Sequence, residues 1–283
     1  MRRVRTIVRI MALTTVVAGG LAATTTAAHA ATIPVACSEN ALVAAVNLAN
    51  STSAPDTLVL ASGCTYAMTS PHGGLANALP VITSRIEMLG PATVTRSSLL
   101  PFRIAEVSSK GSLTLTTGVA FTGGSVVGSG GGILNSGAVT LTVSSLTGNT
   151  ATLNGGGLAN ADTPNGTAPA ATLTRSPVSD NTALLQGGGI YNGVRGTLTT
   201  TGVTGSPLFI IGNAAGTQGG GIAANNSTAT TLTDTTVTSN SAVLTAGGVH
   251  RSGGTMTTTN TPITANIPNN CVGSAPAVPN CTG

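Results

Sequence analysis

The sequence predicts an all-β protein, a right-handed parallel β-helix with a short capping helix at its N-terminus. A run of glycines followed by an aliphatic residue recurs along the chain, and an asparagine recurs in step with it. Short threonine-rich segments of alternating pattern lie between them, with no helical period. Columns that advance together indicate one structural unit per repeat, stacked on its neighbours. The aliphatic residues are Ile133, Leu158, Ile190, Ile222 and Val249, and the asparagines are Asn149, Asn181, Asn213, Asn240 and Asn266.

Residues 1–30 have the layout of a secretory signal peptide. A basic start precedes the apolar stretch "MALTTVVAGGLAA", and "AHA" at 28–30 supplies the small residues of a cleavage site. The apolar stretch is short and interrupted by threonine, which argues against a membrane span. We therefore expect export and a mature chain that begins at Ala31. Loss of the leader lowers the number of basic residues from 11 to 7, against 7 acidic residues, so the charge gives no support to a nucleic-acid partner.

Residues 31–54 are predicted to form an N-terminal cap with a helix over 38–50. Ser38 is suited to the N-cap position, because its hydroxyl can accept from a free backbone N–H. A cap is expected because the open end of a β-helix would expose unpaired strand edges. The apolar face of the predicted helix consists of Leu42, Ala45, Val46 and Ala49.

The four cysteines lie in two pairs at opposite ends of the predicted mature chain. In an exported protein we expect disulfides, and Cys37–Cys64 with Cys271–Cys281 is the economical choice among the three possible pairings. Metal ligation is the alternative, but neither pair has the spacing of a zinc site or a histidine close in sequence. The first disulfide would tie the cap to the first coil, and the second would close the tail at 271–283 over the last coil.

Residues 55–270 are predicted to form the coils, each with two or three short strands that stack about 4.8 Å from their counterparts. Inward columns of Leu, Ile and Val suit a chain with 2 Tyr, 3 Phe and no Trp. Glycine recurs where the chain turns, because close-packed coils leave no room for a Cβ at a tight corner. The asparagine column fits a ladder, in which each side-chain amide bonds the amides above and below it.

The cysteine-led helix and the segments "DTLVLASGCTY", "LPVITSRIEMLG" and "FRIAEVSSKGSLTL" resemble those of secreted right-handed parallel β-helix repeat proteins of actinobacteria. The repeats are also similar to those of chlamydial polymorphic outer-membrane proteins, where Gly-Gly-Ala-Ile and Phe-x-x-Asn elements recur. The segments 131–133 and 146–149 take those places here. The resemblance implies a pectin-lyase-like solenoid, and the chlamydial proteins are adhesins. A fold of this kind is nevertheless a poor guide to function.

Catalysis is the main alternative, because β-helices include polysaccharide lyases and glycosidases. Such enzymes need clustered carboxylates. By register no two carboxylates converge, and Asp234 shares a column with Arg175 two coils away, about 10 Å. We therefore expect no catalysis, no metal and no cofactor. The whole set of carboxylates is Glu39, Asp56, Glu87, Glu106, Asp162, Asp180 and Asp234.

The histidines downstream of the leader, His72 and His250, lie far apart in the sequence, and we expect both at surface turns. Tyr191 and Arg195, placed near Asp162 by the repeat, form a weaker hypothesis of a small sugar-binding patch. Ordinary loop chemistry is the alternative there.

Threonine pairs recur nine and seven residues before the asparagine column, with a core-facing residue between them. They would form two files on one outer face, about 7 Å apart along the strand and repeated every ~4.8 Å along the axis. Such a face is a candidate binding surface for a repeating polymer, or for ice, although threonine also simply favours strands. The pairs are Thr140/Thr142, Thr172/Thr174, Thr197/Thr199, Thr231/Thr233 and Thr257/Thr259, with Thr114/Thr116 offset by one residue.

These observations predict a secreted or cell-surface scaffold without catalysis, adhesive toward cell-wall glycan or a host or environmental surface. We expect a monomer with no membrane span and no nucleic-acid partner. A polysaccharide lyase or glycosidase is the alternative function, and ice binding through the threonine array is a minor one.

Overall fold

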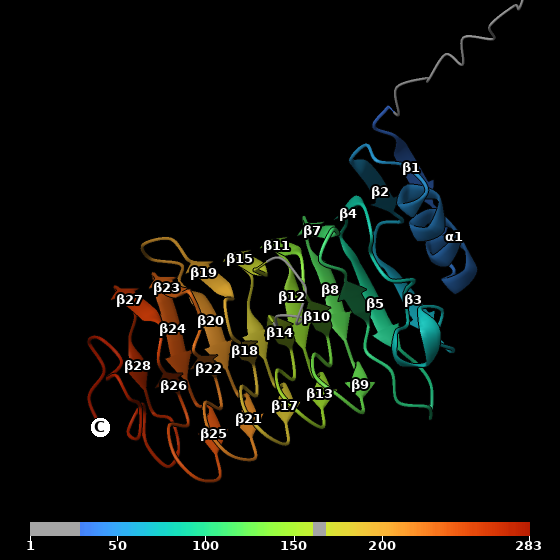
Figure 1. Cartoon of the computed structure of the whole chain (residues 1–283). Coiled ribbons are helices and arrows are strands. Elements are labelled where there is room, and N and C mark those ends of the chain that lie inside the picture. The colour runs from blue at the N-terminus through green and yellow to red at the C-terminus, as the bar shows by residue number, and fades with distance from the viewer. Residues whose placement is uncertain (1–28, 161–167) are drawn as a thin grey trace, which may run out of the picture.

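The computed structural model describes residues 29–160 and 168–283, and these fold as a parallel β-helix (Figure 1). All neighbouring strands within its four sheets run parallel, so the predicted fold class is confirmed. From β7 (Ser112–Thr116) onwards, each coil visits the nine-, eight-, five- and six-stranded sheets in that order.

The strands of the nine-stranded sheet have four or five residues, and those of the eight-stranded sheet have two to five. The nine-stranded sheet consists of β1 (Thr32–Val35), β2 (Asp56–Leu60), β4 (Arg85–Leu89), β7, β11 (Ala138–Thr142), β15 (Ala170–Thr174), β19 (Thr197–Thr201), β23 (Ala229–Thr233) and β27 (Thr255–Thr259). The eight-stranded sheet consists of β3 (Cys64–Met68), β5 (Ala92–Arg96), β8 (Val119–Thr122), β12 (Ser145–Thr147), β16 (Val178–Ser179), β20 (Leu208–Ile211), β24 (Thr235–Thr238) and β28 (Ile263–Thr264).

The strands of the other two sheets have two to four residues. The six-stranded sheet consists of β6 (Ala105–Val107), β10 (Ile133–Asn135), β14 (Leu158–Asn160), β18 (Ile190–Asn192), β22 (Ile222–Asn225) and β26 (Val249–Ser252). The five-stranded sheet consists of β9 (Ser125–Val126), β13 (Thr150–Ala151), β17 (Thr182–Ala183), β21 (Ala214–Ala215) and β25 (Ser241–Ala242). Each full coil therefore holds four strands rather than the two or three that were predicted. Strands of two residues are too short to show an alternating pattern in the sequence.

The core is a set of stacked aliphatic columns, as the composition predicts. The residues that follow the glycine runs, Ile133 through Val249, are all fully buried. In the nine-stranded sheet a leucine column is replaced at two coils by Thr200 and Thr258. The hydroxyl of Thr200 remains paired in the core, 2.9 Å from the Thr235 hydroxyl. The large aromatic side chains of the core lie in the first coils, where Tyr66, Phe102 and Phe121 are fully buried.

The glycine runs turn the chain between the five-stranded and six-stranded sheets. The first residue of each run has a positive φ, +67° at Gly155, a conformation that favours glycine; in the last run Ala246 takes this position with a φ of +50°. The second has no room for a side chain, because a Cβ on Gly156 would lie 2.5 Å from the carbonyl oxygen of Gly188 in the next coil. A Cβ on the third, Gly157, would lie 3.0 Å from the Asn181 amide nitrogen. Glycine and asparagine recur in step because they pack against each other.

The N-terminal end is closed by α1 (Glu39–Asn50), whose N-cap is Ser38. The Ser38 hydroxyl accepts from the backbone N–H of Ala41 at 3.2 Å, and the predicted apolar face is buried. Cys37 and Cys64 are paired, which joins the start of the helix to β3. One difference concerns the boundary at residue 55: β1 precedes the helix and pairs with β2, so the nine-stranded sheet already begins at Thr32.

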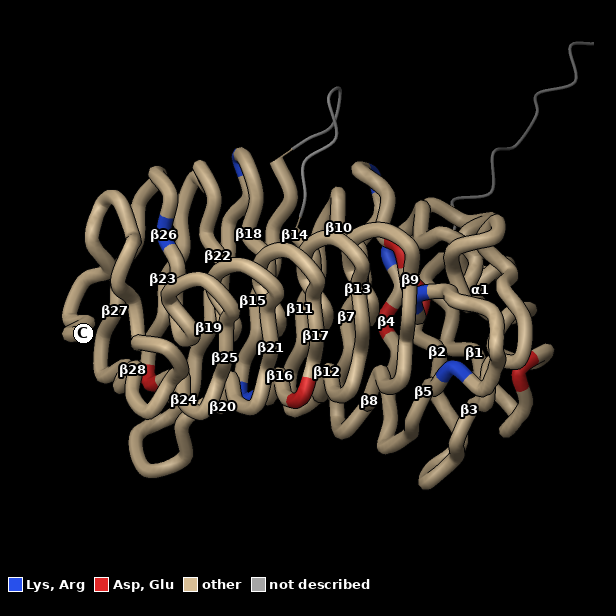
Figure 2. Tube along the Cα trace, turned by 90° about the horizontal axis from the view of Figure 1, so that it is seen from below, with Lys and Arg blue, Asp and Glu red and all other residues tan. Residues whose placement is uncertain are grey.

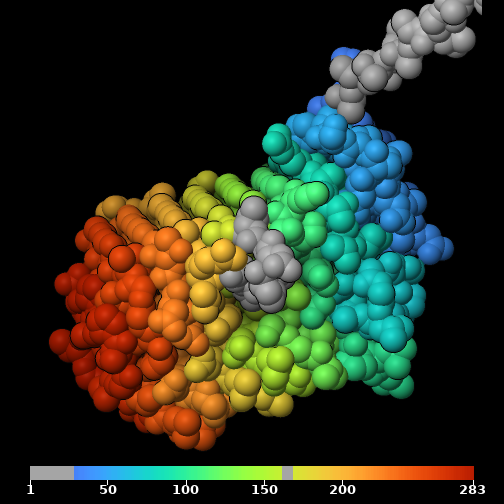
Figure 3. All heavy atoms as spheres, in the orientation of Figure 1, coloured from blue at the N-terminus to red at the C-terminus, as the bar shows by residue number. Residues whose placement is uncertain are grey.

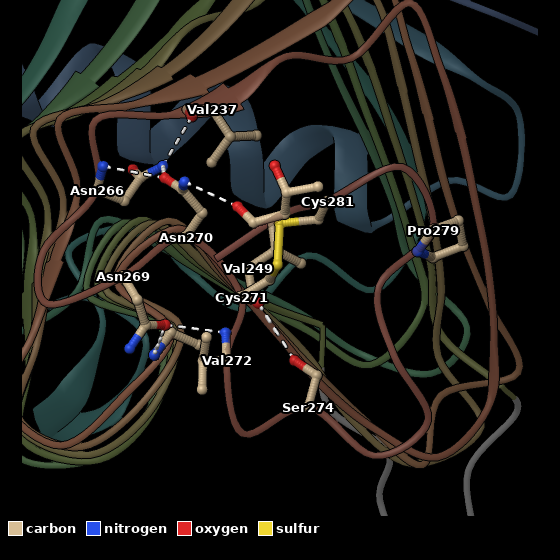
Figure 4. The surroundings of a disulfide bond; sticks show 12 residues. Val237, Val249, Asn266, Asn269, Asn270, Cys271, Val272, Ser274, Pro279 and Cys281 are labelled. Carbon is tan, nitrogen blue, oxygen red and sulfur yellow. Dashed lines mark hydrogen bonds between the residues drawn. A yellow bond between two sulfur atoms is a disulfide. The ribbon is translucent and has the colours of Figure 1, made fainter.

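The C-terminal end is closed by the tail that Cys271 and Cys281 enclose (Figure 4). Asn270, next to Cys271, accepts from the side chain of the last ladder residue, Asn266, at 3.1 Å. Its own side chain donates to the carbonyl of Thr282 at 3.2 Å. Within the β-helix, the side chain of each ladder asparagine is satisfied by the next coil. At the C-terminal end the tail supplies these hydrogen-bond partners instead. The remaining short element is the 3₁₀ turn η1 (Gly74–Ala76).

Candidate binding face

The outer surface of the nine-stranded sheet carries two files of threonine in register. Each strand of this sheet from β7 to β27 contributes one threonine to each file, at the positions on either side of a buried residue. We call these residues the threonine face. The first file is Thr114, Thr140, Thr172, Thr199, Thr231 and Thr257, and the second is Thr116, Thr142, Thr174, Thr201, Thr233 and Thr259.

This register corrects one sequence prediction and confirms another. In β19 the pair is Thr199/Thr201 and not Thr197/Thr199, because Thr197 lies in register with Ala170 and Ala229. An insertion after β19 delays the next asparagine by fewer residues than was assumed. The extension of the files to Thr114/Thr116 is confirmed, since both pair directly with their counterparts in β11. The one-residue offset lies in the segment between Thr116 and Gly124 and not in the strand register. The corrected files are therefore more regular than the predicted ones.

The threonine face is uncharged over six consecutive strands. Its side chains are half-buried from β7 to β23 and exposed at β27. None of these six strands of the nine-stranded sheet carries a charged residue, and Figure 2 shows the charges gathered elsewhere, several of them around β4. In the space-filling view the coils follow one another as regular parallel ridges along the upper edge (Figure 3). The face offers a lattice of hydroxyl groups that can both donate and accept.

A pocket of about 290 Å³ lies where the first threonine file continues toward the N-terminal end. There Glu87 takes the place of a threonine, between Thr57 and Thr114. Its carboxylate accepts from the hydroxyls of Thr57 and Thr116, each at 3.1 Å. Sequence reasoning missed this site, although the alternating patterns of 56–60 and 85–89 already place Thr57 and Glu87 on one face. The lining also includes Pro55, Asp56, Arg85, Ile86 and Ser112.

Asp56 and Glu87 both line this pocket, but Asp56 is in register with Ile86 and Glu87 with Thr57, so the two side chains lie on opposite faces of the sheet. Asp56 is buried, with 1% of its surface exposed. It accepts from the Thr52 hydroxyl at 2.6 Å and from the backbone N–H of Ala31 at 2.7 Å.

The remaining described carboxylates are held separately. Asp180 is exposed at a corner with a φ of +56°, and Asp234 accepts from the side-chain amide of Asn260 at 3.2 Å. Arg175 occupies the same corner column as Asp234, with one coil between them. Glu106 pairs with Arg103 at 3.1 Å; burial lowers the pKa of Arg103, and the charge of Glu106 opposes that shift. These positions suit local turns and ion pairs rather than a shared site.

The two histidines have different environments. His72 lies at a turn, as predicted, with Nε2 2.8 Å from the carboxylate of Glu39. The prediction for His250 is wrong, because this residue lies in β26 and is 6% exposed. Burial lowers its pKa, opposed by a backbone hydrogen bond with Gly273. The C-terminal tail lies over this end of the sheet, which a repeat pattern does not reveal.

Only two of the three residues of the predicted sugar patch lie in the described part of the chain. Asp162 lies outside the described residues. Tyr191 is half-buried in β18, where its hydroxyl lies 3.5 Å from the side-chain amide of Asn225. Arg195 lies at the following corner with a φ of +60°. In the described residues, no three His, Cys, Asp or Glu side chains lie close enough to hold a metal ion.

The asparagine column forms a buried ladder. Asn149, Asn181, Asn213, Asn240 and Asn266 each donate from the side-chain amide to the side-chain oxygen of the next member, at 2.9 to 3.1 Å. That oxygen also accepts from the preceding member's backbone N–H. A second ladder of Asn135, Asn160 and Asn192 was missed, although these residues end the segments "GGGILN", "GGGLAN" and "GGGIYN". Both ladders are buried and have a structural role.

None of the described helices is long and apolar enough to cross a membrane. No protein-family model, no curated protein and no solved structure matches this chain. The fold and the geometry of the threonine face are therefore the observations from which a function is argued.

Proposed function

We propose that the protein is a secreted, non-catalytic β-helix scaffold that binds an uncharged polysaccharide, such as a cell-wall glycan, on its threonine face. The observation that carries this proposal is the pair of threonine files in register over six strands, without an intervening charge. A polymer that lies along the axis meets the same pair of hydroxyls at every coil. Many weak contacts of this kind add to useful affinity through multivalency.

The composition of the face favours a neutral polymer. Hydroxyl groups recognise other hydroxyl groups by exchanging hydrogen bonds in both directions. An anionic partner would be expected to meet lysine or arginine, and none lies on the six strands that carry the threonine face. The pocket at Glu87 and Arg85 lies in line with the first file, so one end of a bound chain can reach it.

The test is co-sedimentation with insoluble neutral glycans and with cell-wall preparations. Thr172→Lys combined with Thr231→Lys is expected to weaken binding by about tenfold or more, because each lysine disrupts one row of the lattice. The control is Thr122→Lys combined with Thr238→Lys, which makes the same replacements on the outer side of the eight-stranded sheet. Equal binding by the two variants, or no binding by the parent protein, would contradict the proposed adhesion.

The non-catalytic part of the proposal has its own assay. The carboxylates of Asp56 and Glu87 are both engaged in hydrogen bonds to neighbouring residues, which supports a structural role for the pair. Incubation with pectins, xylans and neutral glycans is expected to release no reducing ends and no unsaturated product. Turnover that is lost in Glu87→Gln would establish an enzyme and reject this part.

Ice binding through the same face is a second candidate. The corrected register favours it, because both files continue without a break over six strands. Thermal hysteresis and ice-shaping assays on the unmodified protein decide this candidate, with the two lysine variants as above.

A further inference from the structure

Asp56 is a buried carboxylate for which the described residues provide no cationic partner. Only 1% of its surface is exposed, and its two hydrogen-bond donors, the Thr52 hydroxyl and the Ala31 backbone N–H, are both neutral. Arg85 lines the same pocket, but the ion pairs of the described residues are His72–Glu39 and Arg103–Glu106. Burying a carboxylate without a compensating charge costs free energy, so we expect a cation next to Asp56.

The group closest to supplying that cation is the nitrogen of Ala31. It lies 2.7 Å from Oδ1 of Asp56, and the carbonyl of Ala31 accepts from the backbone N–H of Thr57 at 2.8 Å. Ala31 is thus held on both sides immediately before β1, the edge strand of the nine-stranded sheet (Figure 1). Ala30 and Ala31 are both exposed, so the peptide bond between them is accessible to a protease.

We propose that the Ala30–Ala31 bond is hydrolysed and that the new α-ammonium group of Ala31 forms an ion pair with the buried carboxylate of Asp56. In this step an endopeptidase of the signal-peptidase class adds one water. The carbonyl carbon of Ala30 becomes a carboxylate, and the nitrogen of Ala31 leaves as an amine that takes up a proton. The nitrogen stays where the amide nitrogen lies, so a neutral donor is replaced by a charged one. This inference rests on the secretion that is part of the proposed function.

The ion pair can form only if the chain is cleaved directly before Ala31. A chain that begins one residue earlier keeps a neutral amide at Ala31 and places its ammonium group about 3.8 Å further along the backbone. A chain that begins one residue later loses both the ammonium group and the carbonyl that pairs with Thr57. Cleavage after Ala30 is therefore the one choice that completes the site and holds β1 against β2.

The ion pair is tested with purified, disulfide-bonded chains that begin at Ala30, Ala31 or Thr32, each released from a fusion by a protease that leaves no extra residue. The chain that begins at Ala31 is expected to show the highest denaturation midpoint, and hydrogen exchange in β1 slower by about tenfold or more than in the other two. A mere backbone hydrogen bond would make the chains that begin at Ala30 and Ala31 equal, and that result overturns the ion pair.

Asp56→Asn in the chains that begin at Ala30 and Ala31 completes a double-mutant cycle, and the advantage of the Ala31 start is expected to vanish. If that advantage persists after the Asp56→Asn change, the ion pair is wrong. If Asp56→Asn prevents folding, the comparison of the three chains still tests the ion pair. N-terminal sequencing of the protein recovered from producing cells tests the processing step, and any first residue other than Ala31 overturns it. Neither experiment depends on glycan binding, so a failure of this inference can be distinguished from a failure of the proposed adhesion.

Discussion

The side-chain amide of each ladder asparagine donates and accepts hydrogen bonds between coils, as a backbone peptide group does. In Asn181 the amide nitrogen donates to the carbonyl of Leu146 and to the side-chain oxygen of Asn213. The side-chain oxygen accepts from both the backbone N–H and the side chain of Asn149. All of these groups are buried, so water is not available to replace a lost partner.

Asn181→Ala is therefore expected to destabilise the protein by about 3 kcal/mol, because it leaves two buried donors of Asn149 and one backbone acceptor without partners. The matched control is Asn47→Ala, which makes the same replacement at an exposed position of α1 and should change stability by less than about 0.5 kcal/mol. Urea unfolding followed by circular dichroism measures both. Equal midpoints for the two variants would show that the ladder contributes little.

At the scale of single elements, the carboxylate of Glu39 is one of the groups that hold α1 against the first coil. Glu39 in the first turn of the helix accepts from the backbone N–H groups of Thr69 and Ser70, from the Thr69 hydroxyl and from His72. Burial tends to raise the pKa of Glu39, but these hydrogen bonds outweigh it and lower the pKa to about 2. The carboxylate thus favours the folded cap only while it is ionised.

A depressed pKa gives stability that is present above the ordinary value of 4.5 and is lost as the pH falls toward about 2. We expect the amide resonances of Thr69 and Ser70 to titrate with a midpoint near 2, followed by NMR. In Glu39→Gln this titration should be absent, and the cap should be loosened already at neutral pH. A midpoint near 4.5 in the parent protein would contradict the assigned hydrogen bonds.

Sequence patterns predicted the elements whose residues repeat. The capping helix, the leucine columns and the spacing of Asn149 to Asn266 are visible because each depends on a residue type at a fixed interval. The register of β19 was misjudged, since an insertion between Thr201 and Asn213 changes the interval from which it was counted. The pocket at Glu87 was missed because it joins β2, β4 and β7, which lie ahead of the regular repeats. Contacts made by irregular segments, such as those of the C-terminal tail with His250, produce no periodic pattern in the sequence.

At the scale of the whole molecule, each coil contacts mainly its two neighbours, so stability is distributed along one axis. Cys271→Ser combined with Cys281→Ser is expected to cost ~2–5 kcal/mol and to open the C-terminal end first. Hydrogen exchange should accelerate in β26 and β28 and stay unchanged in β7 and β11.

Replacement of Cys37 and Cys64 by serine provides the matched comparison. It should accelerate exchange in α1 and the first strands, and leave the C-terminal coils unchanged. Acceleration along the whole axis in either variant would indicate a single cooperative unit and contradict this description.

The ladder also gives the interior of the molecule an electrical direction. In every side-chain amide from Asn149 to Asn266 the oxygen faces the preceding member and one N–H faces the next, so the hydrogen bonds between ladder members all run in the same direction along the axis. The column begins on a donor, the backbone N–H of Gly124, and ends on an acceptor, the carbonyl of Thr282. The two ends of the asparagine column are therefore not interchangeable: the end at Gly124 is its negative pole and the end at Thr282 its positive pole.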